Sequence, residues 1–263
     1  MKTNCIFDDY NLTFLLMPTE IYIPVILFLG SLVYATFGFG DAIFAMPFLT
    51  LLVSTKIATP IMTLNGLTLA TLMLIKHHNN INWNITKKLV LAAFFGIPIG
   101  IYFLKCGNEN LIKTFLYVFI ILVALFNLFF TKYKVNLNEK FAYLFGFIGG
   151  ILGGAFNTAG PPIVIFGILK NWTTLQFIGN LQGYFIISDI FIIVGQIISD
   201  ILNKTVLYYF VISLPFTLIA FLVGNKIRQK ISEEHYKKYI YFLLILVGVY
   251  GLIRIYFITN NFK

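Results

Sequence analysis

The sequence predicts an all-α polytopic membrane protein made of two four-segment repeats, eight hydrophobic segments in all. Three observations carry this prediction. Of the 263 residues, 59% are hydrophobic and only 11% are charged, whereas a soluble domain has about 25% charged residues. The apolar residues gather into segments of about 20, the length that crosses a bilayer. Glycine and proline interrupt the first segment of each half in the same way.

The first repeat spans residues 21–130 and begins with a long apolar segment, 21–53. The stretch GFGDAIFAMP breaks this segment near Gly38–Asp41, because glycine and proline both interrupt regular helical structure. Three uninterrupted apolar segments follow, at 57–75, 85–104 and 111–130. A polar linker with three lysines, 131–140, then separates the two halves.

The second repeat, 141–258, has the same order of segments. Its first segment, 141–169, is broken near Asn157–Gly160 by GAFNTAGPPI, and apolar segments follow at 173–198, 206–225 and 236–257. Lipid cannot hydrogen-bond a broken backbone, so irregular backbone at membrane depth lies against protein or a water-filled cavity. Matched breaks in two halves are typical of a transporter binding site. We therefore expect residues 1–263 to form a single transmembrane transporter domain.

The distribution of charge predicts how the segments cross the membrane. The formal net charge is +9, but basic residues of membrane proteins gather in short cytoplasmic loops, so this charge does not indicate a nucleic-acid partner. If every segment crosses once, the 19 Lys and Arg divide 10 to 9 between the faces. If both broken segments are hairpins of two half-helices, they divide 12 to 7. The second arrangement predicts inverted repeats in the cell membrane with both termini outside.

Three motifs carry a resemblance to a known family. The run GFGD at 38–41 followed by MPFL at 46–49 resembles a first-repeat pattern GxGGG…VPxL. The run GGILGG at 149–154 followed by AGPPIV at 159–164 resembles a second-repeat pattern GxxGGxxGxGGPP, and His77 with the loop NNINW resembles HxxxGxxxW. These patterns are those of the TauE/SafE family of sulfite exporters and sulfonate permeases, and the resemblance covers nearly the whole chain.

The resemblance implies a polytopic transporter that moves sulfite or a related sulfur-containing organic anion by ion coupling. Two departures leave the substrate open. Asp41 stands where the family usually has glycine, and Asn157-Thr158 replace smaller residues.

The two breaks form the predicted anion-binding site. The N-terminus of a half-helix exposes free N–H groups and the positive end of the helix dipole, and both favour anions. Proline suits the first helical position because it needs no donor there, which we expect of Pro161. The alternative is that these glycines only permit tight helix packing. The predicted substrate-binding residues at the breaks are Gly38, Gly40, Asp41, Ala42, Asn157, Thr158, Gly160, Pro161 and Ile163.

Asp41 is the most informative single residue, since a carboxylate inside a membrane segment is costly and indicates function. At the start of the second half-helix it would act as an N-cap. Ionised, it would occupy the N–H groups that an anion needs; protonated, it becomes neutral. We therefore expect protonation of Asp41 to permit anion binding and to couple transport to protons. The alternative is a plain helix cap that faces water. Asp189 is the second proton-coupling candidate, with a structural hydrogen bond as its alternative.

Asn65, Asn180 and Gln182 occupy similar places in the two repeats, where they either line the cavity or make interhelical hydrogen bonds. We expect a secondary active transporter of a small anion, with the lipid bilayer and a coupling proton as partners and a homodimer left open. We expect no metal, no cofactor and no catalytic residue, because Cys5 and Cys106 make no metal-ligand pattern and no nucleophile–base arrangement stands out. Three alternatives stay open: an anion channel, an intramembrane enzyme and a non-transporting membrane assembly factor.

Overall fold

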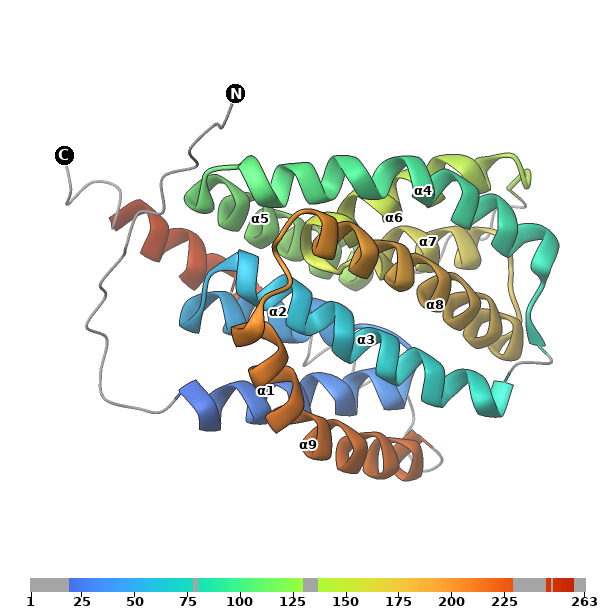
Figure 1. Ribbon diagram of the computed structural model, residues 1–263. Coiled ribbons are helices and arrows are strands. Elements are labelled where there is room, and N and C mark those ends of the chain that lie inside the picture. The colour runs from blue at the N-terminus through green and yellow to red at the C-terminus, as the bar shows by residue number, and fades with distance from the viewer. Residues whose placement is uncertain (1–18, 78–79, 130–136, 229–244, 247, 258–263) are drawn as a thin grey trace.

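The computed structural model describes residues 19–77, 80–129, 137–228, 245–246 and 248–257, and these residues contain helices and no strand (Figure 1). The long helices run side by side, and the connections between them gather at the two ends of the bundle. Most of the predicted linker and the first part of the last predicted segment lie outside the described residues.

The helices follow the predicted segments within a few residues. The first half contains α1 (Thr19–Phe37), α2 (Asp41–Leu52), α3 (Thr55–His77), α4 (Trp83–Cys106) and α5 (Glu109–Phe129). The second half contains α6 (Phe141–Phe156), α7 (Gly160–Leu169), α8 (Thr174–Ile198) and α9 (Lys204–Arg228), and residues 248–257 are also helical.

Five of the described helices are long and apolar enough to cross a membrane: α1, α3, α4, α8 and α9. Three others, α2, α6 and α7, are apolar but have 12, 16 and 10 residues, whereas a span needs about 20. These helices confirm the prediction of an all-α membrane protein. The arrangement as two repeats of four segments stays a prediction.

Both broken segments fold as helical hairpins. Between α1 and α2, Gly38 and Gly40 have φ angles of 85° and 99°, a left-handed conformation that glycine adopts without steric cost. The helix α2 then turns back along α1, since a Cβ placed on Gly30 would lie 3.2 Å from the Ala45 Cβ. Between α6 and α7, Asn157 takes the left-handed conformation at φ 55°.

The helix α7 ends beside the start of α6. The Leu137 N–H donates to the Leu169 carbonyl at 3.4 Å, and the Glu139 carboxylate lies 3.9 Å from the Lys170 Nζ and 2.7 Å from the Lys88 Nζ. The hydrogen bond from Lys88 lowers the pKa of Glu139. Residues 137–139 and 169–170 therefore lie at the same end of the bundle, as expected if the segment 141–169 does not cross it.

Glycine stripes allow the helices to pack closely. Gly150 and Gly154 on α6 lie against Gly96 and Gly100 on α4, Gly146 lies against Leu89 of α4, and a Cβ on Gly150 would lie 2.5 Å from the Ala93 carbonyl oxygen. Within lipid, small residues at every fourth position let two helix backbones approach, and this contact drives their association.

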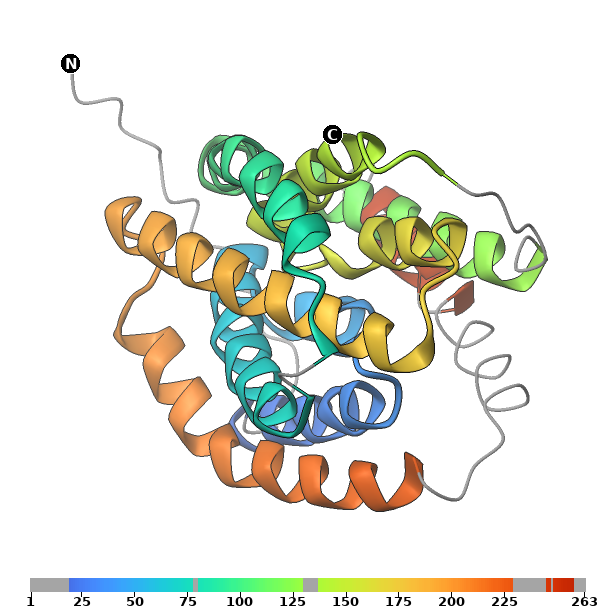
Figure 2. The same cartoon turned by 90° about the vertical axis from the view of Figure 1, so that its right-hand side faces the viewer.

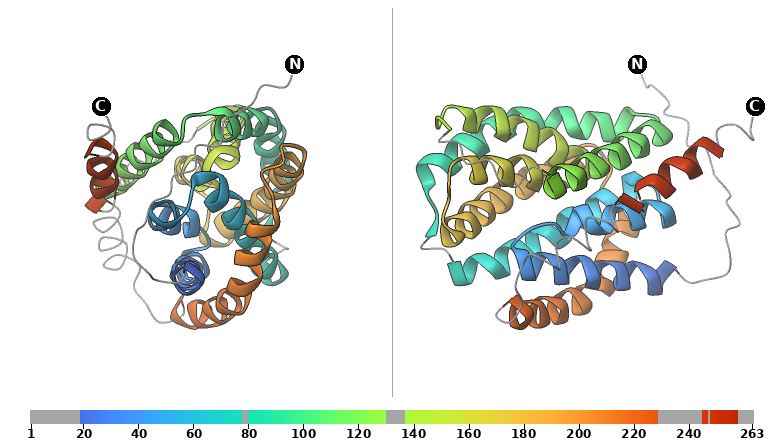
Figure 3. Two further views of the ribbon diagram at one scale, coloured as in Figure 1. Left: turned by 60° about the vertical axis from the view of Figure 1, so that its left-hand side comes forward. Right: turned by 180° about the vertical axis from the view of Figure 1, so that it is seen from behind.

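The same kind of contact joins α1 to α9, where a Cβ on Gly224 would lie 2.6 Å from the Ala35 Cβ. Figures 2 and 3 show the α1–α9 and α4–α6 pairs on opposite sides of α3 and α8, which pack against each other.

A side chain at Gly150 should therefore destabilise the fold. We expect Gly150→Leu to lower the free energy of unfolding by about 1–3 kcal/mol, because the new side chain meets backbone atoms of α4 that cannot move aside. Thermal unfolding of the detergent-purified protein measures this loss. The control is Phe95→Leu on α4, since Phe95 is 69% exposed. Equal stability of the two variants would contradict the close α4–α6 contact.

Candidate functional site

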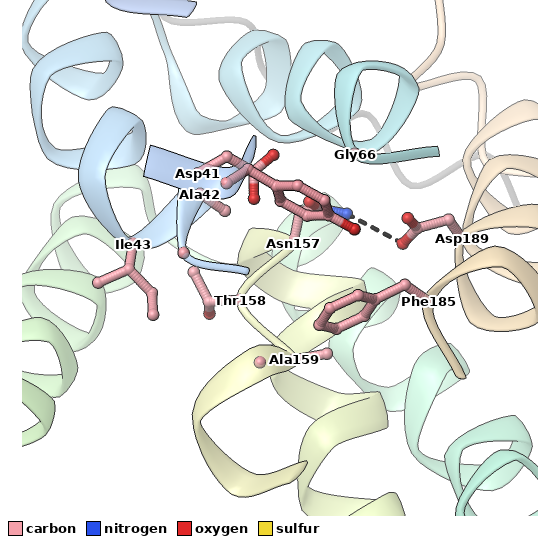
Figure 4. Close-up of a pocket in the computed structure, with 12 residues that line it drawn as sticks. Asp41, Ala42, Ile43, Gly66, Asn157, Thr158, Ala159, Phe185 and Asp189 are labelled. Atoms are coloured by element: carbon pink, nitrogen blue, oxygen red, sulfur yellow. Dashed lines mark hydrogen bonds between the residues drawn. The ribbon is translucent and has the colours of Figure 1, made fainter. Parts of the chain in front are cut away.

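A small cavity lies between the two helix breaks, and Figure 4 shows the side chains that surround it. Its volume is about 20 Å³, which is room for about one water molecule. An anion with four or more heavy atoms would therefore need the cavity to widen. The lining residues come from both halves of the chain: Tyr34, Gly40, Asp41, Ala42, Ile43, Gly66, Asn157, Thr158, Ala159, Gly160, Phe185 and Asp189.

The first break brings Asp41 to the cavity wall. Gly40 is the N-cap of α2 and Asp41 is its first helical residue, so the prediction that Asp41 caps the helix is wrong. The reason is that the left-handed glycine supplies the N-cap position and leaves Asp41 one residue inside the helix. The Asp41 carboxyl interacts with the Ala42 N–H and the Asn65 amide. Asp41 is 5% exposed and its Oδ2 has no hydrogen-bond partner.

The second break offers fewer N–H donors than the sequence suggested. The helix α7 starts at Gly160, so Pro161 is its second residue and not its first as predicted. Pro161 and Pro162 have no N–H and remove two donors from this helix N-terminus. A Cβ on Gly160 would lie 3.6 Å from the Phe39 ring and 3.7 Å from the Phe185 ring. These two aromatic side chains therefore cover the N-terminal end of α7.

Asp189 on α8 reaches the same cavity from the other side. The Asn157 Nδ2 donates to the Asp189 Oδ1 at 3.3 Å, which Figure 4 shows as a dashed line. A Cβ placed on Gly66 of α3 would lie 3.3 Å from both the Asn157 Oδ1 and the Asp189 Oδ2. It would lie 3.9 Å from the Asp41 Oδ2. The two carboxyl groups therefore converge beside Gly66.

The charge of the cavity is unbalanced. Its lining contains two Asp residues and no Lys, Arg or His, although an anion was expected to bind there. Across the described residues, no three side chains of His, Cys, Asp or Glu gather as metal ligands would. The arrangement can therefore exchange protons at two carboxyl groups and offer polar contacts from Asn157 and Thr158.

Seven of the predicted site residues line the cavity: Gly40, Asp41, Ala42, Asn157, Thr158, Gly160 and Asp189. Gly38, Pro161 and Ile163 lie outside its lining.

The three amide residues predicted to line the cavity make interhelical hydrogen bonds instead. The Asn180 Oδ1 accepts from the Asn82 N–H at 2.6 Å. Asn65 on α3 donates to the Ser31 hydroxyl on α1 and accepts from the Thr217 hydroxyl on α9, at 3.3 and 2.7 Å. These contacts match the alternative interpretation of such residues, in which they join helices to one another.

Gln182 joins α8 to the first break. Its Nε2 donates to the Gly38 carbonyl at 2.8 Å, and its Oε1 accepts from the buried Tyr34 hydroxyl. The Tyr34 and Phe185 rings lie 6.3 Å apart, between centroids, on the same side of the cavity. These contacts fix the position of the Gly38–Gly40 connection relative to α8.

Sequence reasoning missed five lining residues: Tyr34, Ile43, Gly66, Ala159 and Phe185. One signal was present, because a lone glycine inside an apolar helix such as α3 often marks a close approach or a functional position. The two aromatic residues carry no such signal in a chain with 29 Phe and 15 Tyr.

Comparison with known families gives a match over most of the chain. The family model described as sulfite exporter TauE/SafE matches residues 22–251, a range that includes both breaks and every residue of the cavity lining. Comparisons with curated proteins and with solved structures gave no match.

Removal of the Gln182 side-chain amide should destabilise the first break. Gln182→Leu leaves the buried Tyr34 hydroxyl and the Gly38 carbonyl without partners, so we expect a loss of about 1–3 kcal/mol in the free energy of unfolding. A double-mutant cycle with Tyr34→Phe in thermal unfolding measures the coupling. The two substitutions together should cost less than the sum of the single losses, and strict additivity would show that this hydrogen bond adds no stability.

Proposed function

We propose, from the premise that the chain belongs to the sulfite exporter TauE/SafE family, that it is a secondary active transporter of a small sulfur-containing anion. Members of this family are membrane transporters and not enzymes. The substrate class proposed here is sulfite, a sulfonate or a related organosulfur anion. The proposed location is the cell membrane.

The observation that carries the proposal is the cavity between the two breaks. It lies where the N-terminus of α2 meets the connection between α6 and α7, and broken helices of this kind hold substrates near the middle of the membrane in many transporters. Once Asp41 is neutral, the N–H groups at the start of α2 become free to bind an anion. Asn157 and Thr158 supply polar side chains on the opposite wall.

Proton coupling follows from the charge of the site. An ionised Asp41 would repel an entering anion and would occupy the Ala42 N–H itself. Protonation removes the repulsion and frees this donor. The anion therefore enters the cavity together with a proton, and the proton gradient supplies the driving force.

Alternating access would rock one half against the other around this cavity. The packing of the helices supports two related halves, because the first hairpin helix of each half packs against the second helix after the hairpin of the other half: α1 against α9, and α6 against α4. Helices α3 and α8 occupy corresponding places and meet each other between the pairs. We therefore propose inverted repeats over residues 21–130 and 141–258.

Binding of sulfur anions tests the proposed function. We expect sulfite or methanesulfonate to raise the unfolding temperature of the purified protein more at acid than at neutral pH, because a ligand that binds only the folded state stabilises it. Acetate serves as the non-sulfur control, and Asp200→Asn as the matched variant, since Asp200 is exposed and lies outside the cavity. Absence of stabilisation by every sulfur anion would refute the proposal. In proteoliposomes, counterflow distinguishes a carrier from an anion channel.

Cysteine labelling tests the topology. In a background without Cys5 and Cys106, we expect Lys140→Cys and Lys170→Cys to be protected from a membrane-impermeant maleimide in intact cells, and Lys105→Cys to be labelled. The reason is that positions 140 and 170 flank the α6–α7 hairpin on the lysine-rich face, which should be cytoplasmic. Labelling of position 140 but not 170 would mean that the segment crosses the membrane.

A further inference from the structure

We propose that Asp41 and Asp189 act as one titrating pair that holds the cavity at a single negative charge, so that only a monovalent anion enters, together with one proton. This inference rests on the proposed function and makes it specific. It names the charge of the substrate, the number of protons and the second carboxyl group.

The geometry of the two carboxyl groups carries the first step. Asp41 belongs to α2 and Asp189 to α8, yet their Oδ2 atoms lie 3.9 and 3.3 Å from the same point beside Gly66. The separation of these oxygens therefore cannot exceed the sum of the two distances. Both residues are 5% exposed, so little water screens one carboxyl from the other.

The hydrogen bonds of Asp41 and Asp189 indicate different protonation states for the two carboxyl groups. The Asn157 Nδ2 donates to the Asp189 Oδ1 at 3.3 Å, which suits an ionised carboxylate. The Asp41 Oδ2 is buried and has no hydrogen-bond partner. A lone carboxylate oxygen in such a place is unfavourable, whereas a protonated carboxyl is neutral. The pair therefore shares one proton, held mainly by Asp41, when the cavity holds no anion, because two adjacent carboxylates repel each other. When either residue is replaced, the remaining carboxyl no longer faces this repulsion and carries the single negative charge.

The charges around the pair determine what the cavity accepts. The lining residues include no cationic side chain, so two ionised carboxylates would leave two uncompensated charges inside the membrane. With one proton the pair carries one negative charge. When a second proton neutralises the pair, a monovalent anion restores the total charge of one negative charge in the cavity. A divalent anion would instead raise this total to two negative charges. Hydrogen sulfite or a monosulfonate therefore fits, and a divalent oxyanion does not.

Few other titratable groups face the pair. Tyr34 from α1 lines the cavity, and α8 contributes Tyr184, five residues before Asp189. Around the pair, α3 supplies Asn65 and Gly66, and the α6–α7 connection supplies Asn157 and Thr158. The pH dependence of anion binding thus belongs to the two aspartates.

Three consequences distinguish the pair from a single titrating residue. The apparent affinity for methanesulfonate should rise about tenfold for each pH unit of acidification above the midpoint, because one proton binds with the anion. Asp41→Asn and Asp189→Asn should each keep this slope, since the remaining carboxyl still has to be neutralised. The double substitution Asp41→Asn/Asp189→Asn should bind methanesulfonate with less than a twofold change over the same pH series.

The experiment measures methanesulfonate affinity by thermal shift over a pH series for the wild type, both single variants, the double variant and the control Asp200→Asn. Thiosulfate, which carries two charges, should give no shift at concentrations that saturate methanesulfonate. In proteoliposomes, a pH gradient should drive methanesulfonate uptake and a potassium–valinomycin potential should not, because the anion and proton together carry no net charge.

Four results would contradict the proposal of a titrating pair. Two concern the pH dependence of methanesulfonate affinity: its loss in Asp41→Asn or Asp189→Asn alone, and its retention in the double variant. The other two are preferred binding of thiosulfate and wild-type uptake driven by membrane potential. Loss in Asp41→Asn alone would leave the proposed function intact with Asp41 as the single coupling residue. Absence of binding by any sulfur anion would instead remove the proposed function, and the pair with it.

Discussion

Two carboxyl groups meet inside the helix bundle at a cavity whose lining residues include no cationic side chain to balance them. An ion of this size costs several kcal/mol to bury even after the protein relaxes, and Asp41 and Asp189 are both almost fully buried. Protonation of either carboxyl group relieves this constraint, because it removes an uncompensated charge. Under the proposed function, the same constraint explains how an acidic cavity can bind an anion in this chain: the anion replaces a charge that the protein already holds there.

Helix packing creates the conditions for this site. The glycines of α4 and α6 let the two backbones touch, and the same holds where Gly224 of α9 meets α1. These pairs position α3 and α8 between them, so Asp189 approaches the break that carries Asp41. Gly66 completes the arrangement, since a larger side chain would press against Asn157 and Asp189 at 3.3 Å. Small residues thus do more here than permit packing: one of them leaves the space in which two acids meet.

The sequence was informative where a residue conflicts with its surroundings. Glycine, proline and aspartate are unexpected in apolar segments, so both breaks, Asp41 and Asp189 could be found without coordinates. The helices could be found for a similar reason, because runs of about 20 apolar residues have few other interpretations. The aromatic residues of the cavity lining, Tyr34 and Phe185, could not be predicted, because Tyr and Phe are common throughout this chain. Asn180 and Gln182 were assigned to the cavity because polar residues in lipid attract a functional interpretation, yet both instead hydrogen-bond neighbouring elements of the bundle.

The two breaks differ in what they offer an anion. At the start of α7, two prolines remove N–H donors and aromatic rings cover Gly160, so this helix contributes its dipole more than its hydrogen bonds. At the start of α2 the N–H groups are present, but the Asp41 carboxyl interacts with them. The acid therefore occupies the place of a substrate at the stronger of the two donor sets. In the proposed mechanism, an anion gains access to these donors by displacing the Asp41 side chain, and protonation of the aspartate pair makes that displacement possible. Because Asp41 stands where the resembling family pattern has glycine, this competition is a property of this chain's own sequence and not of broken helices in general.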